Sequence, residues 1–206
     1  EDQSIVINLS GTDVDGDALS FSLDSDATNG GVVIDGNIAT YTPNENYNGN
    51  DSFSFTVNDG ELDDTASVTL TVDPVNDAPV LATVVDVAFD EDLSTSITLS
   101  GSDVDGDAIS YSISEGTDIV AALDGSDITF TASENFNGSE TFTLTVSDGN
   151  GAEDSQSISV TVNAVNDPPV ATTGLSGITN EDQSVVVNLS GSDIDGDNLT
   201  FSLESD

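Results

Sequence analysis

Residues 52–57 read Ser-Phe-Ser-Phe-Thr-Val, so every second side chain is apolar and those between are polar. Successive side chains of a β-strand point to opposite faces, and this alternation is therefore typical of a strand with one buried face. The same pattern returns in residues 68–72, 142–146 and 158–162. We predict an all-β fold with an ordered core, despite the high charge of the chain.

The strand pattern belongs to a repeat of 90 residues. Asp-x-Asp-Gly-Asp begins at Asp13, Asp103 and Asp193, and Glu-Asp recurs at Glu1, Glu91 and Glu181. Such self-similarity is the signature of a repeat architecture. We therefore expect one complete repeat at residues 79–168. It is preceded by a repeat at 1–78 that lacks its first strand and followed by the N-terminal part of a third at 169–206.

Turn residues every 8 to 12 positions divide the complete repeat into seven short strands, which predicts a Greek-key β-sandwich. The expected strands are residues 81–88, 96–99, 108–113, 119–123, 128–131, 140–146 and 156–162. In the first repeat, Asp35-Gly36 predicts a tight hairpin between residues 32–34 and 38–41.

The charge balance is the second decisive feature. The chain has forty Asp and Glu residues and no Lys, Arg or His, which gives a net charge of −40. Two carboxylates about 4 Å apart repel by roughly 4 kcal/mol at an effective dielectric near 20, so a compact fold needs cations from its surroundings. Oxygen-only ligands favour Ca²⁺ over Mg²⁺. We expect Ca²⁺ as the cofactor, in place of disulfides, because the chain has no Cys.

Composition also excludes several classes of partner and reaction. Nucleic acid is not expected, because phosphate binding needs Lys and Arg. No run of about 20 apolar residues or basic leader occurs, so we expect no membrane insertion in this segment, which looks like an excerpt of a longer chain. Without His, Cys, Lys or Arg, the usual nucleophile and base pairs cannot be built, and we expect no enzyme.

The alternation of strand direction predicts where the acidic loops lie. The loops that hold Glu91, Glu134 and Asp167 share one end of the complete repeat, whereas those with Asp103 and Asp148 share the other. If successive repeats stack head to tail, two acidic junctions form, with enough oxygens for one to three ions each.

The candidate metal ligands follow from this arrangement. The first junction gathers Glu1, Glu45, Asn76, Asp77, Asp103, Asp105 and Asp148. The second gathers Glu91, Glu134, Asn166, Asp167, Asp193 and Asp195. The equivalent positions Asp13, Asp15, Asp59 and Glu181 complete the set.

The acidic motif has two other interpretations besides metal binding. An EF-hand loop has Gly at its sixth position, whereas Gly16, Gly106 and Gly196 occupy the fourth. The motif also suits a plain turn, because Asp and Gly favour turns. For the third acid of each motif, turn formation and metal binding both stay open; these acids are Asp17, Asp107 and Asp197.

Val-Asn-Asp-x-Pro at residues 75–79 and 165–169 marks the connectors, because Pro cannot continue a central strand. Four further motifs accompany this linker: the early Glu, the Asp-x-Asp motif, the loop Glu at 45 and 134, and the Asp-Gly at 59 and 148. With these motifs the chain resembles the cadherin-like tandem repeats of large bacterial surface adhesins. More distantly, it is similar to cadherin extracellular repeats. The resemblance implies cadherin/Ig-like sandwiches in an extended rod with Ca²⁺ between repeats. Departures at positions 74, 78, 164 and 168 favour one or two ions per junction.

The resulting hypothesis is a calcium-rigidified extracellular stalk of a bacterial surface protein, whose partners are the neighbouring repeats. One alternative is a direct binding module for cell-surface or matrix glycans or proteins, or for copies of itself. Another is a segment of a secreted filament whose subunits complete one another. Under the first alternative, sugars would stack on a surface formed by Tyr41, Tyr47 and Phe136. The simpler interpretation is that aromatic side chains close the loops at 44–49 and 133–138 as a plug.

Overall fold

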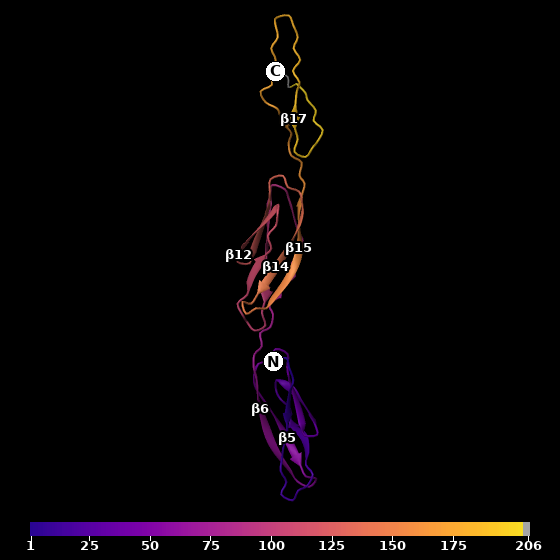
Figure 1. Cartoon of the computed structure of the whole chain (residues 1–206), viewed down its shortest axis with the longest axis vertical. Coiled ribbons are helices and arrows are strands. Elements are labelled where there is room, and N and C mark those ends of the chain that lie inside the picture. The colour runs from indigo at the N-terminus through magenta and orange to yellow at the C-terminus, as the bar shows by residue number, and fades with distance from the viewer. Residues whose placement is uncertain (204–206) are drawn as a thin grey trace. The chain divides into compact units, whose positions relative to one another are not determined.

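The computed structural model describes residues 1–203 and divides the chain into two compact units, Glu1–Asp77 and Ala78–Asp206. The described residues form strands, turns and loops and contain no helix (Figure 1). The predicted all-β class is therefore confirmed. No helix in this part of the chain is long and apolar enough to cross a bilayer.

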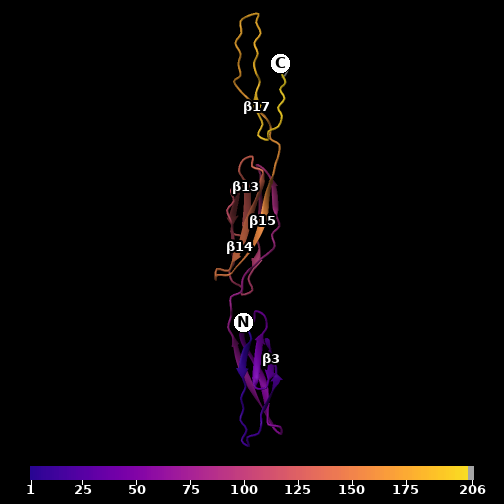
Figure 2. The ribbon, with the colours of Figure 1, turned by 45° about the vertical axis from the view of Figure 1, so that its right-hand side comes forward.

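Unit 1 consists of two antiparallel three-stranded sheets. One has the order β1 (Ile5–Asn8), β4 (Ile38–Pro43), β3 (Gly30–Asp35), and the other β2 (Ser20–Ser25), β5 (Gly49–Asn58), β6 (Asp63–Val72) (Figures 1 and 2). The buried core takes side chains from both sheets and from the loop after β1: Leu9, Val32, Ala39, Tyr41, Phe53 and Phe55. The alternating stretch at 52–57 thus lies within β5, with its aromatic residues in the core.

The β3–β4 hairpin confirms the turn predicted after Asp35. Asp35 pairs with Ile38, so the loop has two residues, Gly36 and Asn37. Gly36 has a φ of 60°, a conformation that glycine adopts without steric cost.

Unit 2 contains a four-stranded and a three-stranded sheet. The first has the order β11 (Ser110–Ile113), β14 (Gly138–Ser147), β15 (Glu153–Asn163), β8 (Val87–Asp90). The second has the order β12 (Ile119–Asp124), β13 (Asp127–Ala132), β9 (Ser94–Thr98). β14 and β15 pair over most of their length and run alongside each other in Figure 2. Side chains from both sheets share one buried core, which identifies a β-sandwich.

The predicted strand at 81–88 is not continuous. β7 (Val80–Leu81) pairs with β10 (Gly101–Ser102) in a two-stranded sheet. By contrast, β8 pairs in parallel with β15 in the four-stranded sheet. Between them the backbone N–H and C=O of Val84 are hydrogen-bonded to the side chain of Gln156, which occupies the place of a sheet partner. The chain therefore changes sheets within a segment that is apolar at most positions, so its pattern does not reveal where the change occurs.

The last part of unit 2 holds two short paired strands, β16 (Val170–Ala171) and β17 (Gly191–Ser192). Residues 172–190 between them run out and back as an extended loop without assigned strands (Figures 1 and 2). Apolar side chains of this loop are exposed, Ile178 to 96%.

Candidate metal sites

Three acidic residues of unit 2 converge, among them Asp167 in the connector that follows β15. Carboxylate oxygens of Glu91, Asp167 and Asp195 lie within 4.8 Å of one another, and these residues are called the Glu91 cluster. The side chain of Glu91 is only 4% exposed. Its Oε1 accepts the N–H of Val165 at 2.5 Å, and Oδ2 of Asp195 accepts the N–H of Asp167 at 2.7 Å. These two bonds hold the connector, which contains Asp167, against Glu91 and Asp195.

The loops around Glu91 hold it in place. The N–H of Glu91 donates to the carbonyl oxygen of Asn163, at the end of β15. Asp92 has a φ of 61°, and its Oδ1 accepts the N–H of Asn135 at 3.2 Å. The loop after β8 and the loop after β13 thus share one end of the sandwich, as the alternation of strand direction predicts.

The negative charge of this cluster affects the carboxyl group of Asp167. Its partial burial, followed by the charges of Asp92, Asp195, Glu91 and Asp193, raises the pKa of the Asp167 carboxyl above its ordinary value. Its Oδ2 is buried without a hydrogen-bond partner. A buried carboxylate oxygen without a donor is costly unless a cation or proton compensates it. The donor set is all oxygen, which fits a hard divalent cation such as Ca²⁺.

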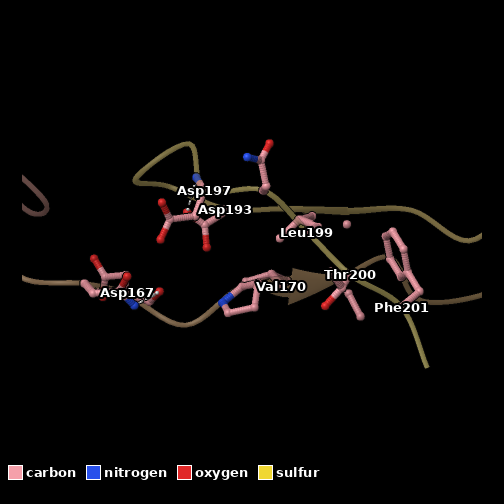
Figure 3. Close-up of a pocket in the computed structure, with 12 residues that line it drawn as sticks. Asp167, Val170, Asp193, Asp197, Leu199, Thr200 and Phe201 are labelled. Carbon is pink, nitrogen blue, oxygen red and sulfur yellow. Dashed lines mark hydrogen bonds between the residues drawn. The ribbon is translucent and has the colours of Figure 1, made fainter. Parts of the chain in front are cut away.

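A pocket of about 330 Å³ adjoins this cluster (Figure 3). Asp167 lies opposite Asp193 and Asp197 at one end, while Leu199 and Phe201 line the other. Oδ1 of Asp193 accepts the N–H of Asp197 at 3.0 Å, which shapes the acidic turn. The acidic end of the pocket therefore suits a cation rather than an anionic ligand.

Unit 1 repeats part of this arrangement 90 residues earlier: Glu1 and Asp77 correspond to Glu91 and Asp167, whereas Asp2 takes the place of Asp195. Oxygens of Glu1, Asp2 and Asp77 lie within 4.8 Å of one another. Oε1 of Glu1 accepts the N–H of Val75 at 3.0 Å, as Glu91 does from Val165. Oδ1 of Asp2 accepts the N–H of Asn46 at 3.0 Å. The chemistry of this second acidic set therefore matches that of the Glu91 cluster.

A third set forms in unit 2, at the end of the sandwich opposite Glu91. Asp103, Asp105 and Asp107 bring oxygens within 4.8 Å, and Oδ2 of Asp103 is buried without a hydrogen-bond partner. Oδ1 of Asp103 accepts the N–H groups of Asp105 at 2.9 Å and Asp107 at 3.2 Å. Oδ2 of Asp107 accepts Nδ2 of Asn150 at 2.6 Å. This bond joins the loop after β10 to the loop after β14, which the sequence also places together.

Several predicted ligands stabilise turns through their Oδ1 atoms. Asp59 accepts the N–H groups of Glu61 and Leu62, both at 2.7 Å, and Asp148 accepts three N–H groups from residues 150–152. The Oδ1 of Asp13 accepts the N–H of Asp17 at 2.9 Å. The interpretation of Asp-Gly loops as shaped turns therefore holds at these positions, while a metal-binding role for their second oxygens stays a prediction.

The remaining predicted ligands lie outside the three acidic groups of the described chain. The side-chain amides of Asn76 and Asn166 donate to the carbonyl oxygens of Asp77 and Asp167. The other members of this set are Asp15, Glu45, Glu134 and Glu181, whose role as ligands stays a prediction.

Two residues of the acidic groups were not among the predicted ligands. Asp2 directly follows the recurrent Glu, and its counterparts Asp92 and Asp182 share its positive φ of about 60°. The recurrence of Asp directly after the recurrent Glu is the sequence signal that could have identified this position, since Asp tolerates positive φ better than most residues. For Asp107 the sequence leaves turn formation and metal binding open; its N–H takes part in the turn, and its carboxylate lies in the third acidic set.

The aromatic residues lie as the plug interpretation requires. Tyr41 is 1% exposed within the core of unit 1, and Phe136 packs against the core of unit 2. The hydroxyl of Tyr47 donates to the carbonyl oxygen of Asn50 at 2.6 Å, closing its own loop. A buried Tyr41 cannot take part in a sugar-stacking surface.

The sequence matches the bacterial Ig domain family over residues 1–72 and 76–161, and the chain therefore belongs to this family. It is 32% identical over 158 residues to Chitinase A from Pseudoalteromonas piscicida, which covers 74% of this chain and 19% of the chitinase. The chain thus spans about a fifth of the length of that relative.

Similar solved structures include two protocadherins and a hydrolase. Protocadherin gamma B2 extracellular cadherin domains 1–5 match at 16% identity with a TM-score of 0.49, covering 85% of this chain and 38% of that one. Human mucin-like protocadherin EC1-2 matches at 18% with a TM-score of 0.44, covering 80% and 100%. An endo-fucoidan hydrolase of glycoside hydrolase family 107 matches at 22% with a TM-score of 0.34, covering 80% and 26%.

Proposed function

We propose that this chain is a non-catalytic extracellular spacer of a bacterial surface or secreted protein, whose successive repeats are held together by Ca²⁺. The repeats correspond to residues 1–78, 79–168 and 169–206, and the neighbouring repeats are the main partners. Membership of the bacterial Ig domain family supports a modular β-sandwich role. The finer assignment, to the stalk of a large adhesin, rests on the repeat and on the acidic connectors.

One observation carries the calcium proposal. Asp167 belongs to the connector, Glu91 to the complete repeat and Asp195 to the segment that follows, yet their oxygens lie within 4.8 Å. An ion there binds all three parts at once. The unbonded, buried Oδ2 of Asp167 and the raised pKa of its carboxyl both indicate a deficit of positive charge. Ca²⁺ accepts six to eight oxygens in irregular geometry, which suits acids drawn from separate segments.

The test uses a substitution whose effect reverses with calcium. Without the ion, Asp167→Asn removes repulsion in the Glu91 cluster and should raise the melting temperature. With the ion, it removes a ligand, so calorimetric titration should show at least tenfold weaker binding at one class of site. Asp124→Asn is the matched control, because Asp124 is exposed and lies outside all three acidic groups. Equal behaviour of the two variants in calcium titrations would contradict the proposal.

A second candidate function is favoured by the match to Chitinase A. The chain covers only 19% of that protein, so the shared part is a module within a larger hydrolase. Under this alternative the chain separates or orients domains of a glycan-degrading enzyme. The flanking sequence distinguishes the candidates: a catalytic domain beside these repeats supports the second, and a long run of further 90-residue repeats supports the first.

Direct adhesion to glycans, or self-assembly into filaments, remains the alternative for this segment itself. Binding of the isolated chain to a glycan array, or calcium-dependent oligomers in light scattering, would favour it over a spacer.

A further inference from the structure

The connector after β15 contains a peptide bond with distinctive chemistry. Residues 164–169 read Ala-Val-Asn-Asp-Pro-Pro and lie between the end of β15 at Asn163 and the start of β16 at Val170. Asp167 and Pro168 are joined by a tertiary amide, whose nitrogen carries no hydrogen. Such a nitrogen accepts a proton more readily than that of an ordinary peptide bond and is then a better leaving group. The Asp167–Pro168 bond is therefore intrinsically easier to hydrolyse than its neighbours.

The side chain of Asp167 supplies a nucleophile for this bond. Attack of its carboxylate oxygen on the carbonyl carbon of the same residue gives a cyclic anhydride, so the reacting atoms are always close together. Pro168 restricts Asp167 to extended conformations, and the N–H of Asp167 donates to Oδ2 of Asp195 at 2.7 Å. The backbone that precedes the bond is thus held. Oδ2 of Asp167 is buried and has no hydrogen bond to break before it attacks.

The carbonyl group of Asp167 is polarised by the preceding residue. Nδ2 of Asn166 donates to the carbonyl oxygen of Asp167 at 3.0 Å. Negative charge develops on this oxygen as the carboxylate attacks, and a donor already aimed at the oxygen stabilises that charge. A side-chain amide is a donor that this chain can provide without Lys, Arg or His. Nucleophile, leaving group and oxyanion donor therefore come from three consecutive positions, with Asn166 and Pro168 flanking Asp167.

The connector after β6 has the donor but not the leaving group. Nδ2 of Asn76 donates to the carbonyl oxygen of Asp77 at 3.1 Å, as Asn166 does to Asp167. Ala78 follows Asp77 in place of proline. The Asp77–Ala78 bond is consequently an ordinary secondary amide, and it provides a natural control within the same chain.

We propose that the chain cleaves itself between Asp167 and Pro168. A carboxylate oxygen of Asp167 attacks the carbonyl carbon of the same residue, and the bond from that carbon to the nitrogen of Pro168 breaks. The nitrogen takes a proton from water and becomes the amine of a new N-terminus. A water molecule then opens the cyclic anhydride, which restores the side-chain carboxyl and leaves a C-terminal carboxyl on Asp167. The net reaction is hydrolysis of one peptide bond, without an oxidant or a reductant.

The reaction needs a free carboxylate on Asp167. A cation bound by Asp167 would engage the same oxygens, so the chain without bound cations is the reactive form. Self-cleavage itself does not rest on the proposed calcium sites, because every part of it belongs to residues 166–168 and their hydrogen bonds. A test in excess chelator therefore separates the outcome for self-cleavage from the outcome for calcium binding.

The experiment incubates the whole chain in excess chelator and mildly acidic buffer, under conditions in which circular dichroism shows that it is folded. Mass spectrometry should detect the fragments 1–167 and 168–206, while the Asp77–Ala78 bond stays intact. The rate should not depend on chain concentration, because the nucleophile belongs to the bond that breaks. In urea the Asp167–Pro168 bond should be cleaved more slowly, and at the same rate as Asp73–Pro74, the other Asp-Pro bond of the sequence.

Three variants identify the parts of the reaction. Asn166→Ala should slow cleavage of the folded chain about tenfold, because it removes the donor to the developing oxyanion. Pro168→Ala should abolish cleavage, whereas Asn180→Ala, which removes an exposed amide elsewhere in unit 2, should leave the rate unchanged. The proposal is overturned if the folded chain is cleaved no faster than the chain in urea, or if Asn166→Ala is cleaved at the parent rate. It is also overturned if the rate rises with chain concentration, because the nucleophile would then come from another molecule.

Discussion

At the scale of single residues, Asp51, a buried acid of unit 1, shows that a carboxylate can be satisfied by hydrogen-bond donors of the protein without a metal. Asp51 accepts the N–H groups of Thr28, Asn29 and Ser52 and the hydroxyl of Tyr41. Burial alone would raise the pKa of Asp51, but these donors outweigh burial and lower it. Sequence reasoning could not separate this residue from the other acids, because its donors are backbone groups brought together by folding.

Asp51→Asn should destabilise unit 1 by about 1–3 kcal/mol at neutral pH, because the amide leaves backbone donors facing its NH₂ group. A lowered pKa in the folded state contributes stability that is present above the unfolded pKa of about 4 and lost as pH falls through the folded value. The difference between variant and parent in urea unfolding should therefore shrink below about pH 4. A difference that stays constant down to pH 2 or that equals the effect of Asp63→Asn would contradict this role.

Tyr41 provides the complementary test at alkaline pH. Burial, then the hydrogen bond and the charge of Asp51, raise its pKa to about 12. A raised phenol pKa contributes stability that is complete below about pH 10 and lost as pH rises toward the folded value. Absorbance titration should show one of the three tyrosines ionising last, and Asp51→Asn should lower that late pKa. Simultaneous ionisation of all three near pH 10 in a chain with a native circular dichroism spectrum would contradict the assignment.

At the scale of elements, alternation predicts long strands well and sheet membership poorly. Residues 140–146 and 156–162 were predicted inside β14 and β15, because one apolar face is visible in the sequence. The split between β7 and β8 was not, because residues 80–89 are apolar at most positions and carry no preference for either sheet. The acidic loops were grouped correctly at each end by strand direction, whereas the individual acids that meet depend on turn geometry that the sequence does not display.

The β3 strand offers a prediction with an adjacent control. A Cβ on Gly30 would lie 2.5 Å from the carbonyl oxygen of Thr42 and 2.5 Å from the ring of Tyr41, whereas one on Gly31 meets nothing within 4 Å. Gly30→Ala should therefore cost about 1–3 kcal/mol through overpacking. Gly31→Ala should be neutral or stabilising by up to about 1 kcal/mol, since it restricts the unfolded chain. Equal unfolding free energies for the two variants would show that the hairpin yields freely.

At the scale of the whole molecule, each unit has its own apolar core, while the proposed calcium ligands lie in loops and connectors. Chelation should therefore leave the circular dichroism of the strands largely unchanged. Under the proposed function it should also increase motion between repeats, which small-angle scattering detects as a broader distribution of distances. An unchanged scattering curve in excess chelator would separate the acidic clusters from any role in ordering the repeats.

A comparison of Ca²⁺ with Mg²⁺ distinguishes coordination at a built site from general screening of charge. Both divalent cations reduce the repulsion among forty carboxylates, but only Ca²⁺ tolerates the irregular coordination that acids from separate loops provide. Mg²⁺ requires nearly octahedral geometry and loses its water reluctantly. Thermal unfolding at matched ionic strength should therefore show greater stabilisation by Ca²⁺, with half-saturation at or below roughly 10⁻⁴–10⁻³ M, the range of extracellular modules. Asp167→Asn should reduce the advantage of Ca²⁺ over Mg²⁺, whereas Asp124→Asn should preserve it. Equal stabilisation by the two ions in the parent chain would mean that diffuse screening, not a built site, holds the repeats together.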